Sequence, residues 1–410
     1  MNRTQLFIAF AITVSILGLA RCMEAPRKQL PRTTADVRGV AYAGADACKA
    51  CHQSIHQNWL TTAHHATSAR PSLTSIKGSF EPGHNTFRYR PELKVVMEQR
   101  KDWCYQVAYM NDVEKQAFPF GMVVGSGRKA QTYLYWWDDN VFQLPISYSV
   151  QAGNWVNSPS YPADKVRFDR LVNIGCFECH GSYIERKGSQ QEGNRQVDYF
   201  DKSKIIYGMD CERCHGPGAE HVSFHTNNPA EKKPQHIALY KQLSQQQQLD
   251  LCAQCHSGGH TSYNSIFQFR PGDSLSQYFS SAIATGSSAS KLDVHGNQYQ
   301  LMTASACFTK SAVLTCTSCH DPHAKERDNT AVLSARCSSC HTSVQHSFAA
   351  QLPAAAITSN CIDCHMPALP SVISLKEEDK QVANVNQVRT HLIAIYAEKS
   401  AEYIKRQRGK

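Results

Sequence analysis

The chain has 410 residues, of which 41% are hydrophobic and 19% are charged, and this balance excludes an intrinsically disordered protein. The length allows two or three ordinary domains. The formal net charge of +9 would by itself fit a nucleic-acid or membrane partner.

The N-terminal segment has the pattern of an export signal. Residues 6–20 form a run of fifteen residues without a charge, shorter than the about 20 apolar residues that span a membrane. Gly18 and Ala20 are small and fit cleavage after Ala20, whereas a lipid anchor at Cys22 would place Arg21 where a small residue is expected. We predict a signal peptide or lipoprotein leader over residues 1–21, leave an uncleaved anchor open, and expect a periplasmic or otherwise extracytoplasmic location.

The pattern Cys-x-x-Cys-His occurs seven times and is the attachment signature of c-type haem. Two thiols add to the vinyl groups of the porphyrin, and the adjacent histidine binds the iron. Zinc would need four protein ligands and no histidine at a fixed place, and a disulfide framework would need no histidine at all. We therefore predict seven covalently bound haem c groups. Their cysteines are Cys48, Cys51, Cys176, Cys179, Cys211, Cys214, Cys252, Cys255, Cys316, Cys319, Cys337, Cys340, Cys361 and Cys364, and the proximal histidines are His52, His180, His215, His256, His320, His341 and His365.

Haem also changes the meaning of the net charge. Without the two leader arginines the chain carries about +7. Each ferric haem adds about one negative charge, because the macrocycle and its propionates outweigh the iron. Seven haems bring the oxidised protein close to neutral, so the basic residues are matched to propionates and nucleic-acid binding has no support.

In chain order, residues 43–77 are expected to form a first haem-binding segment. The first motif runs into a stretch with helical spacing that contains three histidines outside the motif, His56, His64 and His65. Each is a surface histidine or a second ligand to iron, because a low-potential ferric haem usually takes two imidazoles.

A β-rich insertion is predicted over residues 78–150, where 128 positions separate the first two motifs. Trp103, Tyr105, Val107 and Tyr109 alternate in the manner of a strand. The run 133–144 contains a polar turn between two apolar segments and predicts a hairpin. These aromatic residues either form the core of a small sheet or line a substrate site.

Residues 151–372 hold the other six motifs and are expected to form a six-haem core. A glutamine-rich helix is predicted over residues 243–251. His323 and His346 follow motif histidines by three and five positions. Such short spacing makes it hard to reach the far face of the same haem, so each is predicted to serve a neighbouring haem.

The last segment, residues 378–410, is predicted to be a C-terminal helix, because Val385, Val388, Leu392 and Ile395 fall on one stripe. His391 shares that face. A buried core histidine and a haem ligand both fit the pattern.

With about 55 residues per haem, the fold expected is a multihaem cytochrome c fold. It would be mainly α, with long irregular loops, a core packed with porphyrin, and the small β-rich insertion.

The sequence resembles the extracytoplasmic multihaem cytochromes related to cytochrome c-554, within the hydroxylamine oxidoreductase and cytochrome nitrite reductase-like superfamily. The similar stretches cover most of the chain after residue 43. They are the first motif with Trp59, Thr62, His64 and Ala66, then Gly121 to Tyr133, Leu144 to Ser147, Asp210 to Val222, Phe269 to Asp273, and His295 through Ser305, Cys307 and Leu314 to His323.

The resemblance implies distal iron ligands at His64, His221, His295 and His323, and less directly at His391. We add His260 and His346 from their places beside motifs. The superfamily also contains enzymes that convert nitrite, hydroxylamine or tetrathionate. Some of them use a Cys-x-x-Cys-Lys motif, which this sequence lacks.

The leading prediction is an electron carrier in respiration, with mainly bis-histidine haems that exchange electrons with a membrane quinol oxidoreductase or other cytochromes. No catalytic residue is assigned. Two alternatives stay open: an oxidoreductase acting on a small nitrogen or sulfur compound at one open haem, and a subunit of an extracellular haem filament. Cys104 and Cys307 remain outside the motifs and are a candidate disulfide.

Overall fold

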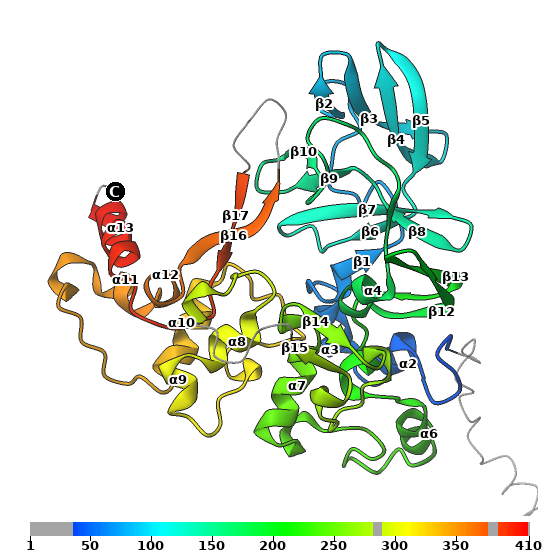
Figure 1. Cartoon of the computed structure of the whole chain (residues 1–410). Helices are drawn as coiled ribbons and strands as arrows, with labels where there is room; N and C mark the ends of the chain where they lie inside the picture. Colours follow the sequence, from blue (N-terminus) through cyan, green and yellow to red (C-terminus); the bar gives the residue numbers. More distant parts are fainter. Residues whose placement is uncertain (1–35, 282–288, 376–383, 409–410) are drawn as a thin grey trace, which may run out of the picture.

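The computed structural model describes residues 36–281, 289–375 and 384–408. Figure 1 shows a β-rich part built from β2 to β10 above a larger part made of short helices and loops. The leader and Cys22 lie outside the described residues. Within them, no helix combines the length and apolar character needed to cross a bilayer.

The described residues are 30% helical and 27% strand, so the expectation of a mainly α fold is wrong. The helices are short, and none of those described exceeds 12 residues. The α-helices are α2 (Ala45–Lys49), α3 (Gln53–Trp59), α4 (Ile174–His180), α5 (Cys211–His215), α6 (Ala219–Asn227), α7 (Gln245–His256), α8 (Gln298–Thr303), α9 (Ala306–Thr309), α10 (Thr330–Ser338), α11 (Ala354–Thr358), α12 (Ile362–His365) and α13 (Ala397–Arg408). The 3-10 helices are η1 (His65–Thr67), η2 (Tyr240–Gln242), η3 (Ile266–Gln268), η4 (Leu275–Gln277), η5 (Ala289–Lys291), η6 (Cys316–Ser318) and η7 (Ala349–Gln351).

The β-rich part holds two antiparallel sheets. One has four strands in the order β2-β3-β4-β5, and the other has seven, with β1-β6-β7-β8-β11 as its main path and β9 joining β7 to β10. The first sheet contains β2 (Thr86–Arg90), β3 (Leu93–Arg100), β4 (Trp103–Met110) and β5 (Val113–Pro119). The second contains β1 (Ser68–Ala69), β6 (Met122–Val124), β7 (Ala130–Trp137), β8 (Asn140–Gln143), β9 (Ile146–Ser149), β10 (Asn154–Asn157) and β11 (Arg170–Leu171).

Two local predictions in this part are confirmed. β7 and β8 form the expected hairpin, with Tyr135 opposite Phe142 and Asp138 in the turn at a φ of 52°. The alternating segment from Trp103 forms β4, although Trp103 itself is exposed at the strand end while Val107 is fully buried.

A hydrophobic core lies within this part and is rich in aromatic residues. Trp155 is 1% exposed and its ring packs against Phe120, Tyr133 and Tyr148 at centroid distances of 5.3–6.3 Å. A Cβ at Gly78 would lie 2.1 Å from the Trp155 ring, so only glycine permits this approach. The aromatic density of the insertion therefore makes a core.

A long hairpin that the sequence pattern did not predict separates the second and third motifs. It is formed by β12 (Gly181–Glu192) and β13 (Arg195–Tyr207), which pair along their length with three register shifts. The outer half of β12 is exposed and polar, so this strand lacks the alternation by which a half-buried strand is recognised.

The C-terminal helix begins later than predicted. Residues 384–389 form β17 (Asn384–Arg389), which pairs with β16 (Ala368–Leu375), and α13 starts only at Ala397. Residues 378–383 of the predicted helix lie outside the described part. Val385 and Val388 are β-branched, and this preference together with the pairing partner outweighs an apparent helical stripe. Elsewhere β14 (His260–Ser262) pairs with β15 (Phe279–Ser281).

The glutamine-rich helix is confirmed as α7, and it is fixed at its start by a capping box between Ser244 and Gln247. This helix ends in the fourth motif. The local sequence thus places the cysteines and histidine of that motif on the last turn of a defined helix.

Candidate haem sites

The seven motifs lie on short helical turns. The amide of the motif histidine donates a hydrogen bond to the carbonyl of the first cysteine, for example from His52 to Cys48 at 2.9 Å and from His365 to Cys361 at 3.0 Å. This i to i+4 bond brings the histidine onto the same face as the first cysteine. Two thiols and an imidazole on one turn form a three-point attachment for a flat group.

Five motif histidines face a second histidine from elsewhere in the chain. The ring centroids are 6.0–6.3 Å apart in every pair, and each second histidine is one of the predicted distal ligands. The pairs are His52 with His221, His256 with His64, His215 with His323, His320 with His391, and His365 with His346.

This separation suits one metal ion between two imidazoles. A metal–imidazole bond is about 2 Å long, and the centroid of a five-membered ring lies roughly 1 Å from its atoms, given ring bonds of about 1.3 Å. Coaxial ligation therefore puts two centroids roughly 6 Å apart. The angle between the ring planes is free to vary, because each ring rotates about its own metal–nitrogen bond.

The Nδ1 atoms of several of these rings are already used. Nδ1 lies 2.9 Å from the Ala394 carbonyl in His365 and 2.7 Å from the Gln235 carbonyl in His221. A carbonyl only accepts, so Nδ1 carries the proton and Nε2 keeps its lone pair. Donation from Nδ1 to a fixed acceptor is the usual support of a metal-bound histidine.

Several of these histidines have lowered pKa values, which favours the neutral form that binds metal. Desolvation by the surrounding protein and, after it, the charge of His64 lower the pKa of His256 to about 4. Burial together with His320 lowers the pKa of His391 to about 4. The pKa values of His64 and His180 are also lowered, mainly by burial.

Two motif histidines are less completely placed. His180 contacts the Thr67 hydroxyl at 3.3 Å, and its pKa is lowered by the charge of His295 after the larger effect of burial. His341 is exposed, and among the described side chains no histidine ring is stacked opposite it. His260 lies in β14 and its side chain is outside the described part. His346, five positions after His341, faces His365, which is the arrangement that short spacing predicts.

Each candidate site offers a pair of histidines, whereas a metal ion held by protein ligands alone needs more ligands than two. Among the described residues no group of three or more histidine, cysteine or acidic side chains could hold a metal ion. Zinc requires about four protein ligands. A haem iron requires two, because the porphyrin supplies the others.

The motifs also contact one another through their thiols. Four pairs of thiols from different motifs lie close enough to shift each other's pKa values, and Cys307 lies close enough to Cys319 and Cys340 to do the same. The four pairs are Cys48 with Cys211, Cys179 with Cys255, Cys252 with Cys316, and Cys337 with Cys361. The first motif thus adjoins the third, the fourth adjoins the second and the fifth, and the sixth adjoins the seventh.

The residues between the two cysteines of a motif carry cross-links that sequence reasoning missed. The buried Arg213 donates to Gln254 Oε1 at 2.6 Å, to the Ile266 carbonyl at 2.9 Å and to the Glu178 carbonyl at 3.3 Å. Arg213, Gln254 and Glu178 belong to the third, fourth and second motifs. In the sequence, only the charged or amide side chains between the two cysteines of a motif could have indicated these cross-links.

The candidate disulfide between Cys104 and Cys307 is not formed, and both thiols are free. Cys104 packs against the core of the β-rich part. Burial raises the pKa of the Cys307 thiol, and the neighbouring Cys340 raises it further. The two cysteines serve separate parts of the molecule.

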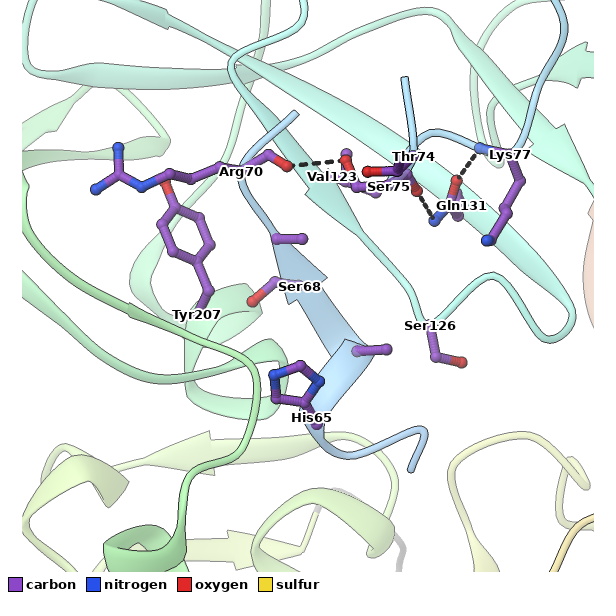
Figure 2. Close-up of a pocket in the computed structure, with 12 residues that line it drawn as sticks. His65, Ser68, Arg70, Thr74, Ser75, Lys77, Val123, Ser126, Gln131 and Tyr207 are labelled. Atoms are coloured by element: carbon purple, nitrogen blue, oxygen red, sulfur yellow. Dashed lines mark hydrogen bonds between the residues drawn. The ribbon is translucent and has the colours of Figure 1, made fainter. Parts of the chain in front are cut away.

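A cavity of about 340 Å³ lies beside β1, between the first haem segment and the seven-stranded sheet (Figure 2). His65, Arg70 and Lys77 contribute basic groups to its wall. Gln131 is fixed there by the Lys77 amide and the Ser75 carbonyl, both at 2.9 Å. No proposed iron ligand lines the cavity, so it is separate from the histidine pairs.

The comparisons with known proteins give information about the fold alone. No family model matches the chain, and no curated protein matches its sequence. A solved structure described as that of the outer cell wall cytochrome OcwA is similar, with a TM-score of 0.54 and 17% sequence identity over 89% of this chain and 82% of that chain. The chain thus shares the fold of a cytochrome, while the resemblance to the cytochrome c-554 family stays a prediction.

Proposed function

We propose that the protein is an extracytoplasmic c-type cytochrome that holds seven haems and carries electrons along them in respiration. The observation that carries this proposal is the set of five histidine pairs at 6.0–6.3 Å, each joining a motif histidine to a histidine outside the motifs. Haem bound there would supply one-electron exchange between ferric and ferrous iron.

The pairs assign two axial ligands to five of the proposed haems. For the second motif, the effect of His295 on His180 makes His295 the proposed distal ligand. His260 is then the candidate left for the sixth motif. Iron with two imidazoles has no free position for a substrate, so this ligand set favours electron transfer over catalysis.

From the neighbouring thiols we infer the spatial order of the proposed haems. Motifs one, three, four and five would form a continuous series, with the second beside the fourth and the sixth and seventh following through Cys307. Porphyrins attached to neighbouring thiols would have neighbouring edges. Such a series suits transfer between a donor at one end, such as a quinol oxidoreductase, and another cytochrome at the other.

The alternative, catalysis at one open iron, concerns the sixth motif, whose proximal histidine is His341. Among the described side chains, no histidine ring is stacked opposite His341. A small nitrogen or sulfur compound would bind at that iron if His260 did not reach it.

Intact mass and the pyridine haemochrome spectrum of the exported protein would count the haems, and EPR of the oxidised protein would report their spin states. We expect seven covalent haems, all low-spin, and no cyanide binding. A protein without covalent haem would refute the proposal. A single high-spin haem that binds cyanide in the wild-type protein would favour the enzyme alternative.

A further inference from the structure

Glu212, a spacer residue of the third motif, has a buried carboxylate with four hydrogen bonds. Oε1 accepts from the amides of Ala43 at 2.9 Å and Gly218 at 2.7 Å. Oε2 accepts from the Gly44 amide at 2.9 Å and from the Arg38 guanidinium at 2.8 Å. The residue is 4% exposed, so these bonds replace the water that a carboxylate otherwise requires.

The two segments that Glu212 binds carry the two histidines of the site at the first motif. Gly44 directly precedes α2, which carries Cys48, and His52 follows one turn later. Gly218 directly precedes α6, which carries His221. The His52 and His221 rings are 6.3 Å apart and inclined by 15°. One carboxylate therefore holds the segments that present the two faces of a single proposed haem.

Further contacts fix the same junction. The Ala219 amide donates to the Ala41 carbonyl at 3.0 Å, which ties the two segments directly. Arg38 also binds Asp210 at 2.6 Å, and Asp210 caps α5 of the third motif. Burial would lower the pKa of Arg38, but hydrogen bonding to Asp36 and the charge of Asp210 raise it, so the guanidinium stays charged.

The buried acidic spacer residue of the second motif binds elsewhere. Glu178 is 2% exposed, and its Oε1 accepts hydrogen bonds from the Ser265 hydroxyl at 2.9 Å and from the Ile266 amide at 3.2 Å. Within the described residues, its carboxylate bonds to Ser265 and Ile266 and not to the segments beside the first motif. Burial of a spacer carboxylate thus does not by itself involve the first motif.

We propose that Glu212 is the positioning residue for both axial ligands of the haem at the first motif, although it belongs to the third. This inference rests on the proposed function. Glu212→Gln keeps the shape but replaces an acceptor oxygen by a donating amide, which leaves buried amides of the two segments without an acceptor. The distance between His52 and His221 would then no longer be fixed.

The test compares three variants of the full exported protein: Glu212→Gln, the matched control Glu178→Gln, and the reference His221→Ala. Haem count by intact mass is combined with EPR and cyanide titration. We expect seven haems in all three, with one low-spin haem in seven converted to a cyanide-binding high-spin form in Glu212→Gln. Its signal should match that of His221→Ala and be absent from Glu178→Gln.

An unchanged EPR spectrum of Glu212→Gln, or the same change in Glu178→Gln, would overturn the inference while seven haems in the wild type still support the proposed function. Loss of covalent haem from the wild type would refute the proposed function instead. Hydrogen exchange of the wild type is a test without mutation: unprotected amides at Ala43, Gly44 and Gly218 would show that Glu212 does not hold these segments.

Discussion

The β-rich part and the last three motifs are stabilised in different ways. Thirteen buried apolar residues form one cluster in the β-rich part, including Val95, Met97 and Trp155. Across residues 306–365, all of which the structure describes, the buried hydrophobic residues are Ile362 and Cys364. The two parts lie at opposite ends of the molecule in Figure 1.

This difference has a thermodynamic consequence. Ordering a segment costs backbone entropy, and two buried apolar side chains supply little hydrophobic burial to offset that cost over residues 306–365. The β-rich part supplies its own core, whereas the last three motifs, on the proposed function, need the faces of bound porphyrins to complete theirs.

The largest effect is therefore expected from preventing haem attachment. Replacing the cysteines of the last three motifs by serine should unfold residues 306–365 and leave the β-rich part intact. Limited proteolysis with mass spectrometry would show new cuts in 306–365 and continued protection of β3, β4 and β7. Equal protection of residues 306–365 with and without haem would remove the distinction between the two parts.

A core substitution should act on the β-rich part alone. Trp155→Ala removes a fully buried indole whose Nε1 donates to the Ser79 carbonyl at 2.9 Å, and we expect a loss of about 3–5 kcal/mol in its free energy of unfolding. Denaturation followed by tryptophan fluorescence measures this loss, while the haem spectrum should not change. Trp137→Ala is the control, because Trp137 is 59% exposed and should alter stability by less than about 0.5 kcal/mol.

Polar cross-links should matter more than apolar contacts around the seventh motif. Arg389 donates to the carbonyls of Ile362 and Met366, both at 2.8 Å, and binds Asp363 at 2.7 Å. Arg389→Gln should destabilise this motif by about 1.5–3 kcal/mol, near the lower end because the pair is partly exposed. Denaturation followed by haem circular dichroism tests this. Arg408→Gln, which loses one exposed bond to Gln351, should have no measurable effect.

The smallest expected effect is a pH dependence near the fifth and sixth motifs. The hydrogen bond from Arg336 lowers the pKa of Glu326, against the opposing effect of burial. A lowered folded-state pKa contributes stability that is present above the unfolded pKa, about 4.5, and is lost as the pH falls through the folded value. Glu326→Gln should flatten the acid limb of the stability curve by on the order of 1 kcal/mol. An unchanged acid limb would contradict this role.

The sequence predicted elements whose cause is local. The hairpin of β7 and β8 follows from a polar turn between apolar runs, and α7 follows from a capping box and helix-forming glutamines. It did not predict the hairpin of β12 and β13, because the exposed outer half of β12 carries no hydrophobic alternation. It also assigned residues 384–389 to a helix, because a stripe of apolar residues does not reveal whether a strand partner is present.

The sequence by itself determined the attachment motifs and the proximal histidines, because five consecutive residues on one helical turn contain all the information needed. Only the tertiary structure decided which second histidine faces which motif. His52 lies between α2 and α3 and His221 lies in α6, and we infer that the Glu212 carboxylate of the third motif brings them together. Pairing of this kind is set by contacts between distant segments, and spacing along the chain does not encode it.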